Sequence, residues 1–363
     1  MLIGTCVYKF DHAYGRVVLN VMKRQILVLC DREKEYAGLM GDFLKTRGDL
    51  PWDVHIYSDT DQMFSDESEN EICLLVIAES TYAEEMQKLN PKKIVLLNEE
   101  GNRGWKDICS VNKYQQAENV LRELLEVYLE TAGESYPQMS SGLGTKFIGI
   151  YSPIRRCMQT TFALTLGQML AEEHKTLYLN FEHFAGHSEL MAEFGRKDLA
   201  DLLYYLNEDK DRFFLRMQSI VQKAGKMDYV PPMKSGQNLL SVAKEDWQRL
   251  MKTIDEMCGY EYVIMDLTDS MQGLFEIMRN CEKIFTITKD DRIAKSKLTQ
   301  YEQILSMYQF GDVIGKTKKC DLPKIKRIPD DIGQYTKSEM ADYIRMQFRD
   351  KGENREKTWD MRN

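Results

Sequence analysis

The sequence predicts an α/β protein with two domains, each built on a parallel β-sheet. Short apolar segments alternate with amphipathic helical segments along most of the chain. Continuous apolar strands separated by helices are typical of parallel sheets that are covered on both faces. Residues 132–145 (AGESYPQMSSGLGT) interrupt this alternation and are rich in Gly, Ser and Pro, so we expect a linker there.

The first expected domain covers residues 25–131 and follows an N-terminal extension of residues 1–24. Apolar runs such as QILVLC and CLLVIAES predict strands, and the run REKEYAGLMGDFLKTR has apolar residues at helical spacing. The extension has no basic segment before an apolar core, so no secretory signal is expected in it. The expected strands are 25–30, 52–59, 73–80, 92–100 and 107–111, and the expected helices are 32–47, 81–90 and 114–130.

The second expected domain covers residues 146–349 and is followed by a charged tail of residues 350–363. The alternation of strand and helix starts again in this part of the chain, which again predicts a parallel sheet. The expected strands are 146–152, 176–182, 260–270 and 282–289, and the expected helices are 160–174, 245–258, 296–310 and 338–349.

Composition excludes several classes of protein. No apolar run approaches the ~18–20 residues that a membrane-spanning helix needs. The eight cysteines form no CxxC pair, which favours a reducing compartment and argues against a disulfide framework or a zinc site. The formal net charge of −8 argues against attraction of the whole protein to nucleic acid or to an anionic membrane.

The segment SPIRRCMQTT, residues 152–161, lies between a predicted strand and a predicted helix. This arrangement is that of a phosphate-binding loop, because free N–H groups and the dipole at a helix N-terminus favour an anion. Thr160 and Thr161 stand where such loops carry a magnesium-binding hydroxyl. The segment therefore predicts a nucleotide site.

Four residues depart from an ordinary phosphate loop. Met158 and Gln159 stand where glycine and lysine are usual, and Arg155 and Arg156 stand where glycines are frequent. Arginine binds phosphate through two parallel hydrogen bonds, so one cation can take the place of another. The same residues also suit a loop without a ligand.

Two acids complete the candidate site. Asp266 ends the apolar strand YVIMD, as the acid that orders Mg²⁺ does beside a phosphate loop. Glu182 follows the strand LYLN in a loop that can face the terminal phosphate. Either acid would also be ordinary in a turn or a solvated loop.

In their order, these segments resemble the deviant Walker A ATPases of the MinD/ParA family. With a receiver-like domain in front, the pattern resembles the TadZ/CpaE-like pilus assembly proteins. The resemblance implies a flavodoxin-like pseudo-receiver domain followed by a P-loop NTPase domain of the MinD/ParA-like, three-layer α/β/α type. It is carried by SPIRRCMQTTFALTLGQ, LYLNFEHFAG, DLADLLYYL, YVIMDLTDSMQGLFEI and IPDD. It implies ATP bound by Pro153, Ile154, Arg155, Arg156, Cys157, Met158, Gln159, Thr160, Thr161 and Pro329, Mg²⁺ bound by Thr160 and Asp266, and Glu182 and Asp266 as catalytic acids.

The sequence lacks both lysines of that family's loop. The signature lysine, which reaches across the dimer, is replaced by Ile154, and the second lysine is replaced by Gln159. Removing a group that stabilises transition-state charge typically slows a reaction by ~10²–10³. We therefore expect ATP binding with weak or absent hydrolysis.

The receiver-like domain also lacks its reactive group. By resemblance, the phospho-accepting position is Ala78 and the hydroxyl position is Asn98, whereas Asp31 and Lys113 remain. An acyl phosphate needs a carboxylate nucleophile, which alanine does not supply. We expect a pseudo-receiver in which Asp31 and Lys113 form a structural ion pair.

The resemblance implies a localisation or assembly factor of a Tad/Flp-type pilus, at the pole of a bacterial cytoplasm. It implies a homodimer through the ATPase domain and contacts with other pilus assembly proteins. Nucleic acid and membrane insertion are not expected. Two alternatives stay open: an active ParA/MinD-type positioning ATPase, and an interaction scaffold that needs no nucleotide.

Overall fold

The chain forms two compact units, and each is described by itself. The first unit comprises Met1–Ser140 together with Asp211–Ser219, and the second comprises Ser141–Lys210 and Ile220–Asn363. The expected tail and most of the expected linker lie outside the described residues. The structure, a computed structural model, describes residues 6–11, 16–21, 24–47, 50–99, 108–131, 144–155, 157–186, 197–208 and 212–349.

The first unit contains a five-stranded parallel sheet with the strand order β4-β3-β5-β6-β7. Counted from its first strand, this order is 2-1-3-4-5, the doubly wound order of flavodoxin-like domains. The parallel sheet confirms the expected α/β class, and the expected helix at 81–90 is a short 3₁₀ helix, η1. The elements are β3 (Gln25–Cys30), α1 (Lys34–Thr46), β4 (Trp52–Tyr57), α2 (Thr60–Glu67), β5 (Ile72–Ala78), η1 (Glu84–Leu89), β6 (Lys93–Asn98), β7 (Cys109–Asn112) and α3 (Ala117–Thr131).

Two parts of the first unit were not anticipated from the sequence. The expected N-terminal extension contains an antiparallel hairpin of β1 (Cys6–Asp11) and β2 (Arg16–Val21). Helix α7 (Phe213–Ile220) comes from the second half of the chain, yet most of it clusters with the first unit. There, Arg47 Nη2 donates a hydrogen bond to Gln218 Oε1 at 3.0 Å.

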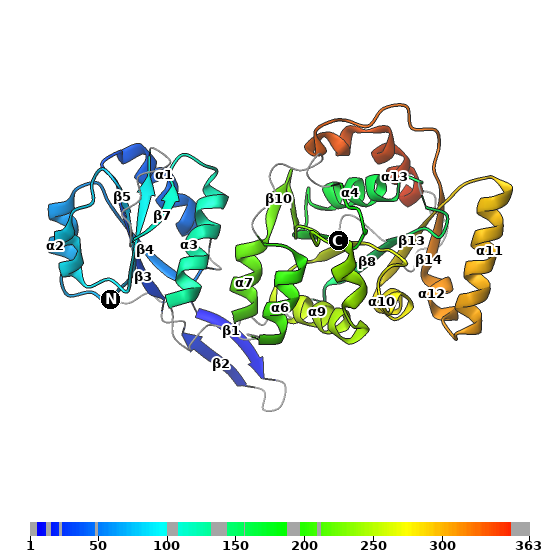
Figure 1. Cartoon of the computed structure of the whole chain (residues 1–363), viewed down its shortest axis with the longest axis horizontal. Helices are drawn as coiled ribbons and strands as arrows, with labels where there is room; N and C mark the ends of the chain where they lie inside the picture. Colours follow the sequence, from blue (N-terminus) through cyan, green and yellow to red (C-terminus); the bar gives the residue numbers. More distant parts are fainter. Residues whose placement is uncertain are drawn as a thin grey trace. The chain divides into compact units, whose positions relative to one another are not determined.

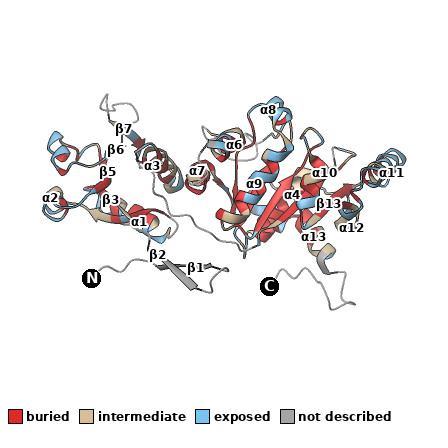
Figure 2. Cartoon of the chain, turned by 90° about the horizontal axis from the view of Figure 1, so that it is seen from below, coloured by how far each residue is buried: buried red, intermediate tan, exposed pale blue. Residues whose placement is uncertain are grey.

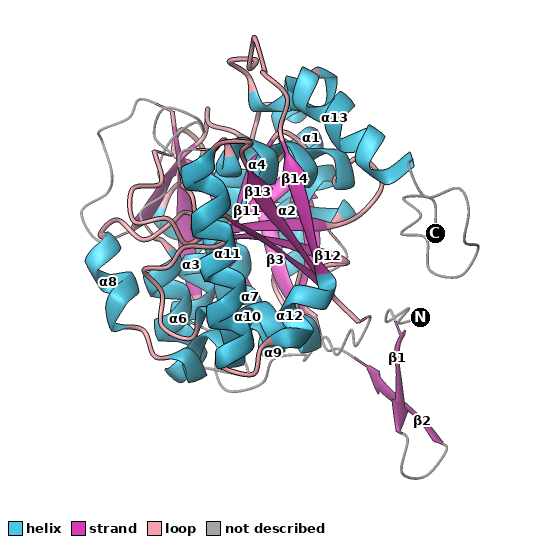
Figure 3. Cartoon of the chain, turned by 90° about the vertical axis from the view of Figure 1, so that its right-hand side faces the viewer, coloured by secondary structure: helices cyan, strands magenta, loops and turns pink. Residues whose placement is uncertain are grey.

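The second unit contains a seven-stranded sheet with the order β10-β11-β9-β12-β8-β13-β14, in which β8 is internal. Strand β10 pairs antiparallel with β11, and the other neighbours are parallel. Helices lie on both sides of this sheet (Figures 1 and 3). The strands are β8 (Lys146–Tyr151), β9 (Thr176–Asn180), β10 (Gln222–Ala224), β11 (Met227–Tyr229), β12 (Tyr262–Asp266), β13 (Lys283–Thr288) and β14 (Thr317–Asp321); the helices are α4 (Gln159–Leu170), α6 (Leu199–Glu208), α8 (Gly236–Ser241), α9 (Lys244–Met257), α10 (Leu274–Asn280), α11 (Arg292–Met307), α12 (Gly311–Lys316), η3 (Ile332–Lys337) and α13 (Glu339–Arg349).

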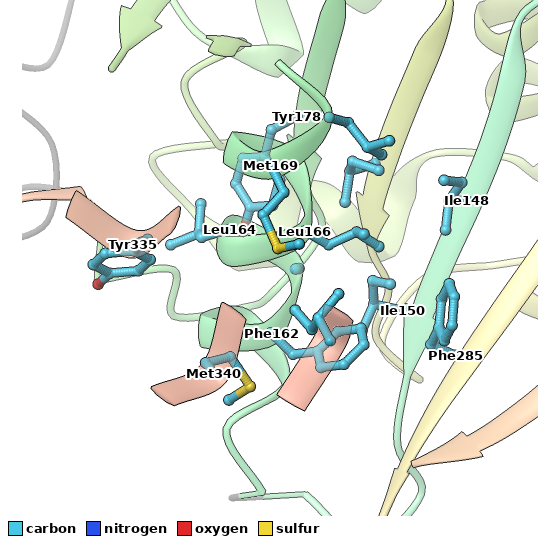
Figure 4. Close-up of a cluster of buried hydrophobic side chains, with 14 of the residues drawn as sticks. Ile148, Ile150, Phe162, Leu164, Leu166, Met169, Tyr178, Phe285, Tyr335 and Met340 are labelled. Atoms are coloured by element: carbon cyan, nitrogen blue, oxygen red, sulfur yellow. The ribbon is translucent and has the colours of Figure 1, made fainter. Parts of the chain in front are cut away.

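Helix α4 is the best buried helix of the second unit, and every residue from Phe162 to Leu170 is buried. Burial colouring shows the sheets as the buried centre of each unit (Figure 2). Phe162 packs against Phe285 of β13 with ring centroids 5.5 Å apart, while Met340 belongs to the same cluster (Figure 4). A Cβ at Gly167 would lie 2.3 Å from Met227 Sδ, so glycine permits this close approach to the sheet. This packing fixes the N-terminus of α4 beside the carboxyl end of β8.

Candidate functional site

The segment 152–161 lies where the strand connections of the second sheet diverge. Strand β8 leads to β9 on one side, whereas its neighbour β13 leads to β14 on the other side. In open α/β sheets, ligands bind in the crevice at such a switch point, outside the carboxyl ends of the strands. The strand register places Asp266 of β12 beside Ile150 of β8 and Asn180 of β9, so both polar residues end their strands at this crevice.

The loop backbone has the left-handed conformation at two positions where glycine was expected. Arg155 has φ 57° and Met158 has φ 63°, although neither is glycine. This conformation costs an L-residue roughly 1–2 kcal/mol. The loop start is anchored by Ser152, whose Oγ donates to Ile287 O at 2.6 Å. Arg156 lies outside the described residues. The loop thus adopts a glycine-type backbone without glycines.

Gln159, which stands at the lysine position, is turned toward the end of β12. Its Nε2 atom donates to Asp266 Oδ1 at 2.7 Å and to Leu267 O at 2.8 Å. Asp266 is fully buried. Burial raises the pKa of Asp266, and hydrogen bonds from Gln159, Thr160 and Tyr178 oppose that rise. The amide therefore uses both of its N–H groups inside the protein.

Two residues of β9 extend this hydrogen-bond network, and the sequence analysis did not assign them. Tyr178 Oη donates to Asp266 Oδ2 at 3.1 Å, and Asn180 Nδ2 donates to Tyr178 Oη at 2.9 Å. Both side chains are buried. Asn180 Oδ1 accepts the backbone N–H of Glu182 at 2.7 Å. The one available signal was their position in a strand that ends beside the predicted acid.

Among the described residues, Arg155 and Lys289 bring positive charge near the loop. Arg155 Nη2 forms hydrogen bonds to both carboxylate oxygens of Asp269, at 2.5 and 2.6 Å. Their side chains are 69% and 46% exposed, so this ion pair contributes at most about 1 kcal/mol. Burial raises the pKa of the Cys157 thiol, and the nearby charge of Lys289, which follows β13, opposes that rise. The sequence analysis missed Asp269 and Lys289.

Glu182 is half-buried in the loop after β9. Burial, with the nearby charge of Asp266, raises the pKa of Glu182 to about 7, while Arg155 acts in the opposite direction. A carboxyl group with such a pKa accepts and releases a proton near neutral pH. The arrangement places one titrating acid and one fully buried acid at the same crevice.

Of the remaining predicted residues, two pack against the hydrophobic core and three are half-buried in or near the loop or further along the chain. Ile154 and Met158 pack against the core cluster under the loop. Thr161 is half-buried in the first turn of α4, and Pro153 is half-buried in the loop. Pro329 is half-buried in the irregular segment between β14 and η3.

A hollow of about 430 Å³ opens at the carboxyl ends of β13 and β14. It is lined by residues that include Lys289, Lys319 and Asp321, and none of its lining residues belongs to the segment 152–161.

The first unit gathers polar groups at the carboxyl ends of its own strands. Lys113, which is fully buried, places Nζ 2.9 Å from Asp31 Oδ2, 3.0 Å from Glu33 Oε1 and 3.1 Å from Glu99 Oε1. Ala78 and Asn98 are the last residues of β5 and β6, and both are buried. The expected Asp31–Lys113 ion pair is therefore present, and Glu33 and Glu99, which were not predicted, join it.

The three carboxylates determine the protonation of Lys113. Burial alone would lower the pKa of Lys113, but hydrogen bonds to Asp31, Glu33 and Glu99 outweigh burial and raise it. The amine therefore stays charged across the neutral range. With alanine at position 78, the cluster holds charged groups but no carboxylate at the expected phosphate-accepting position.

Comparison with known proteins gives likeness at the level of solved structures alone. No family model matches the chain, and a search of curated proteins finds no match. A ParA family ATPase from Chlorobium tepidum is similar over 54% of this chain and 82% of its own, with 16% identity and a TM-score of 0.41. The MinC:MinD complex of Aquifex aeolicus is similar over 56% of this chain and 96% of its own, with 12% identity and a TM-score of 0.41. A putative plasmid partition protein from Borrelia burgdorferi bound to AMPPNP is similar over 56% of this chain and 99% of its own, with 11% identity and a TM-score of 0.38. At these values the likeness assigns the chain to no family.

Two structural features are absent from the described residues. No described helix is long and apolar enough to cross a membrane. No group of three or more described His, Cys, Asp or Glu side chains is arranged to hold a metal ion.

Proposed function

We propose that this chain is a nucleotide-binding localisation or assembly factor, with weak or absent ATP hydrolysis. ATP is the proposed ligand of the loop 152–161. Dimerisation through the second unit is the proposed response to it. The single observation that carries the proposal is the left-handed backbone at Arg155 and Met158, directly before the buried helix α4. This is the conformation that a phosphate loop needs, and it is held here at the cost of backbone strain.

The residues around the loop support binding better than catalysis. The dipole of α4 and the N–H groups of its first turn favour phosphate at the helix N-terminus. Of the described residues, Arg155 and Lys289 supply positive charge nearby, but Arg155 is paired with Asp269. Gln159 carries no charge, and Ile154 packs against the core. Without a lysine at either position, charge that develops on the terminal phosphate lacks its usual partners, and hydrolysis is slow.

The biological setting is proposed from the motif resemblance. The order of motifs resembles that of Tad/Flp-type pilus assembly proteins, so we propose other pilus assembly proteins as partners and a polar position in the bacterial cytoplasm. The net charge of −8 supports protein partners in preference to nucleic acid or membrane. Because function depends on a site and its partners, this assignment needs its own interaction test.

The test is ATP binding by the full chain, measured by calorimetry, with phosphate release followed in parallel. Thr161→Asp places a carboxylate where the phosphate would bind, and an acid in the first turn of a helix does not weaken the helix. Ser296→Asp, at an exposed position of α11, is the matched control for the charge change.

The proposal expects ATP binding that Thr161→Asp abolishes and Ser296→Asp keeps, and a mass in solution that doubles with ATP. Absence of binding by the wild-type chain at millimolar ATP would refute it. Turnover at or above ~1 s⁻¹, within the range of ordinary enzymes, would refute weak hydrolysis.

One observation favours a second candidate, an interaction scaffold that needs no nucleotide. Asp266 already accepts hydrogen bonds from Gln159, Thr160 and Tyr178, so the site is satisfied without a ligand. A chain that dimerises equally with and without ATP would favour this candidate.

A further inference from the structure

The buried carboxyl group of Asp266 has protein donors at both of its oxygens. Gln159 Nε2 donates to Oδ1 at 2.7 Å, and Tyr178 Oη donates to Oδ2 at 3.1 Å. The hydroxyl of Thr160 is hydrogen-bonded to the same carboxyl group. Three converging donors suit an ionised carboxylate, because hydrogen bonds to a charged acceptor are the strong ones.

The donors are themselves held in place from the opposite side. Gln159 Nε2 also donates to Leu267 O at 2.8 Å, so its amide cannot rotate without losing two hydrogen bonds. Tyr178, which is fully buried, accepts from Asn180 Nδ2 at 2.9 Å. The network therefore links the first residue of α4 to the carboxyl ends of β12 and β9, and every contact in it lies within the second unit.

These residues do not fit a magnesium ion. A phosphate-loop metal site needs the loop hydroxyl turned toward the ion and the strand-end carboxylate turned toward the ion or its water ligands. Here the Asp266 carboxylate is instead turned toward the Gln159 amide and the Tyr178 hydroxyl. Mg²⁺ requires a nearly ideal octahedral arrangement of oxygen ligands and dehydrates reluctantly. Opening the site to the ion would leave the Gln159 amide and the Tyr178 hydroxyl without their acceptor, and leaving buried polar groups unpaired is unfavourable.

We infer that this loop takes a metal-free phosphate ligand, with the Gln159 amide occupying the space that a lysine and a hydrated Mg²⁺ ion would share. The part of the inference that concerns ATP rests on the proposed function. The part that concerns the metal rests on the hydrogen bonds among Gln159, Tyr178 and Asp266. The two parts are therefore tested in separate arms.

The first arm measures thermal unfolding of the full chain in millimolar MgCl₂, against EDTA at matched ionic strength. A ligand that binds the folded state alone raises the unfolding temperature, so an ion that the protein's own side chains hold is detected without any nucleotide. The wild-type chain is expected to unfold at the same temperature in both buffers. Stabilisation by MgCl₂ that the variant Asp266→Asn loses would overturn the inference.

The Gln159→Glu variant provides the matched contrast. It has nearly the same shape, but it brings a second carboxylate next to Asp266, 2.7 Å from Oδ1 in the wild-type arrangement. Two carboxylates in contact repel, and a divalent cation relieves the repulsion. This variant is expected to be less stable in EDTA and to be stabilised by MgCl₂. If the variant does not fold, the comparison of the wild-type chain in the two buffers still decides the question.

The second arm measures ATP affinity in the same two buffers. The expected dissociation constants agree within about threefold. Binding that is at least about tenfold tighter with MgCl₂ would overturn the inference. If ATP binds in neither buffer, the proposed function fails, while the first arm still decides whether the protein's own side chains bind the metal.

Discussion

The substitution Lys113→Met tests whether the first unit depends on one buried charge. Lys113 is fully buried, and its carboxylate partners differ in exposure: the side chain of Asp31 is 2% exposed, Glu99 is 27% exposed and Glu33 is 54% exposed. Methionine retains much of the apolar length of lysine but removes the charge. The substitution therefore isolates the electrostatic contribution.

The expected loss follows from these exposures. Breaking a buried ion pair by removing one partner costs about 3–5 kcal/mol, because the other charge stays buried and unpaired. Asp31 is in this position, whereas the pair with Glu33 is exposed and screened by solvent, so it contributes little. We expect Lys113→Met to lower the unfolding free energy by about 3–5 kcal/mol. Asp31→Asn keeps the acceptor for the Glu33 N–H and leaves Lys113 two other carboxylates, so about 1–2 kcal/mol is expected.

The assay is a double-mutant cycle on the full chain. Native-state hydrogen exchange with mass spectrometry of β3 and β5 reports the opening free energy of the first unit, which a single melting temperature of a two-unit chain does not. The double variant removes both charges, so a coupling energy of about 2 kcal/mol is expected. Since the pKa of Lys113 is raised, its contribution is constant at neutral pH and is lost only as the pH rises through the raised value.

A coupling energy below about 0.5 kcal/mol would refute this reasoning, because independent sites add to within that margin. A stabilising Lys113→Met single variant would also refute it. That result would mean that the three carboxylates are solvated well enough to need no cation.

Three further predictions concern the second unit. The pKa of Glu182 is about 7 in the folded protein and has its ordinary value of 4.5 in the unfolded chain. Between these two pH values the folded state binds more protons than the unfolded state, so the free energy of unfolding falls as the pH rises. Glu182→Gln should remove that slope in denaturation series taken at several pH values. Asp269→Asn frees the Arg155 guanidinium and removes a negative charge, so ATP affinity should rise by about threefold to tenfold in calorimetry. Phe162→Ala should cost about 3–5 kcal/mol in urea denaturation, because the side chain is buried against Phe285, whereas Phe184→Ala, at 89% exposure, should change stability by less than about 0.5 kcal/mol.

Much of the sheet architecture was predictable from sequence because parallel strands are buried on both faces. Such strands appear as continuous apolar runs, and the expected strand at 146–152 corresponds to β8, Lys146–Tyr151. Helix α7 shows where this reasoning stops. Phe213, Phe214 and Leu215 are all buried, and the apolar sequence predicts burial without saying which sheet or helix provides it. That choice depends on contacts such as Arg47–Gln218, which join residues 171 positions apart.

The position of the candidate site was predictable from the sequence, but the hydrogen-bond and ion-pair partners of its side chains were not. The rule that polar residues meet at the carboxyl ends of parallel strands brings Asp266 and the loop together, and the structure has Gln159 in contact with this acid. The partner of Arg155 was not predictable, because an exposed arginine can reach several acceptors and Asp269 lies 114 residues away. Tyr178 was likewise hidden, since an aromatic residue in an apolar strand is ordinary core.

The two units treat a buried charge in the same way. Each places one charged group at the carboxyl ends of its parallel strands, Lys113 in the first unit and Asp266 in the second, and surrounds it with groups of its own chain. A buried charge without a partner is strongly unfavourable, so each of these groups needs its internal partners for the unit to remain folded. The same partners compete with any ligand that needs those atoms. A ligand that contacts only the backbone of the loop and the N-terminus of α4 avoids this competition, which is why the geometry favours phosphate binding over metal-assisted hydrolysis.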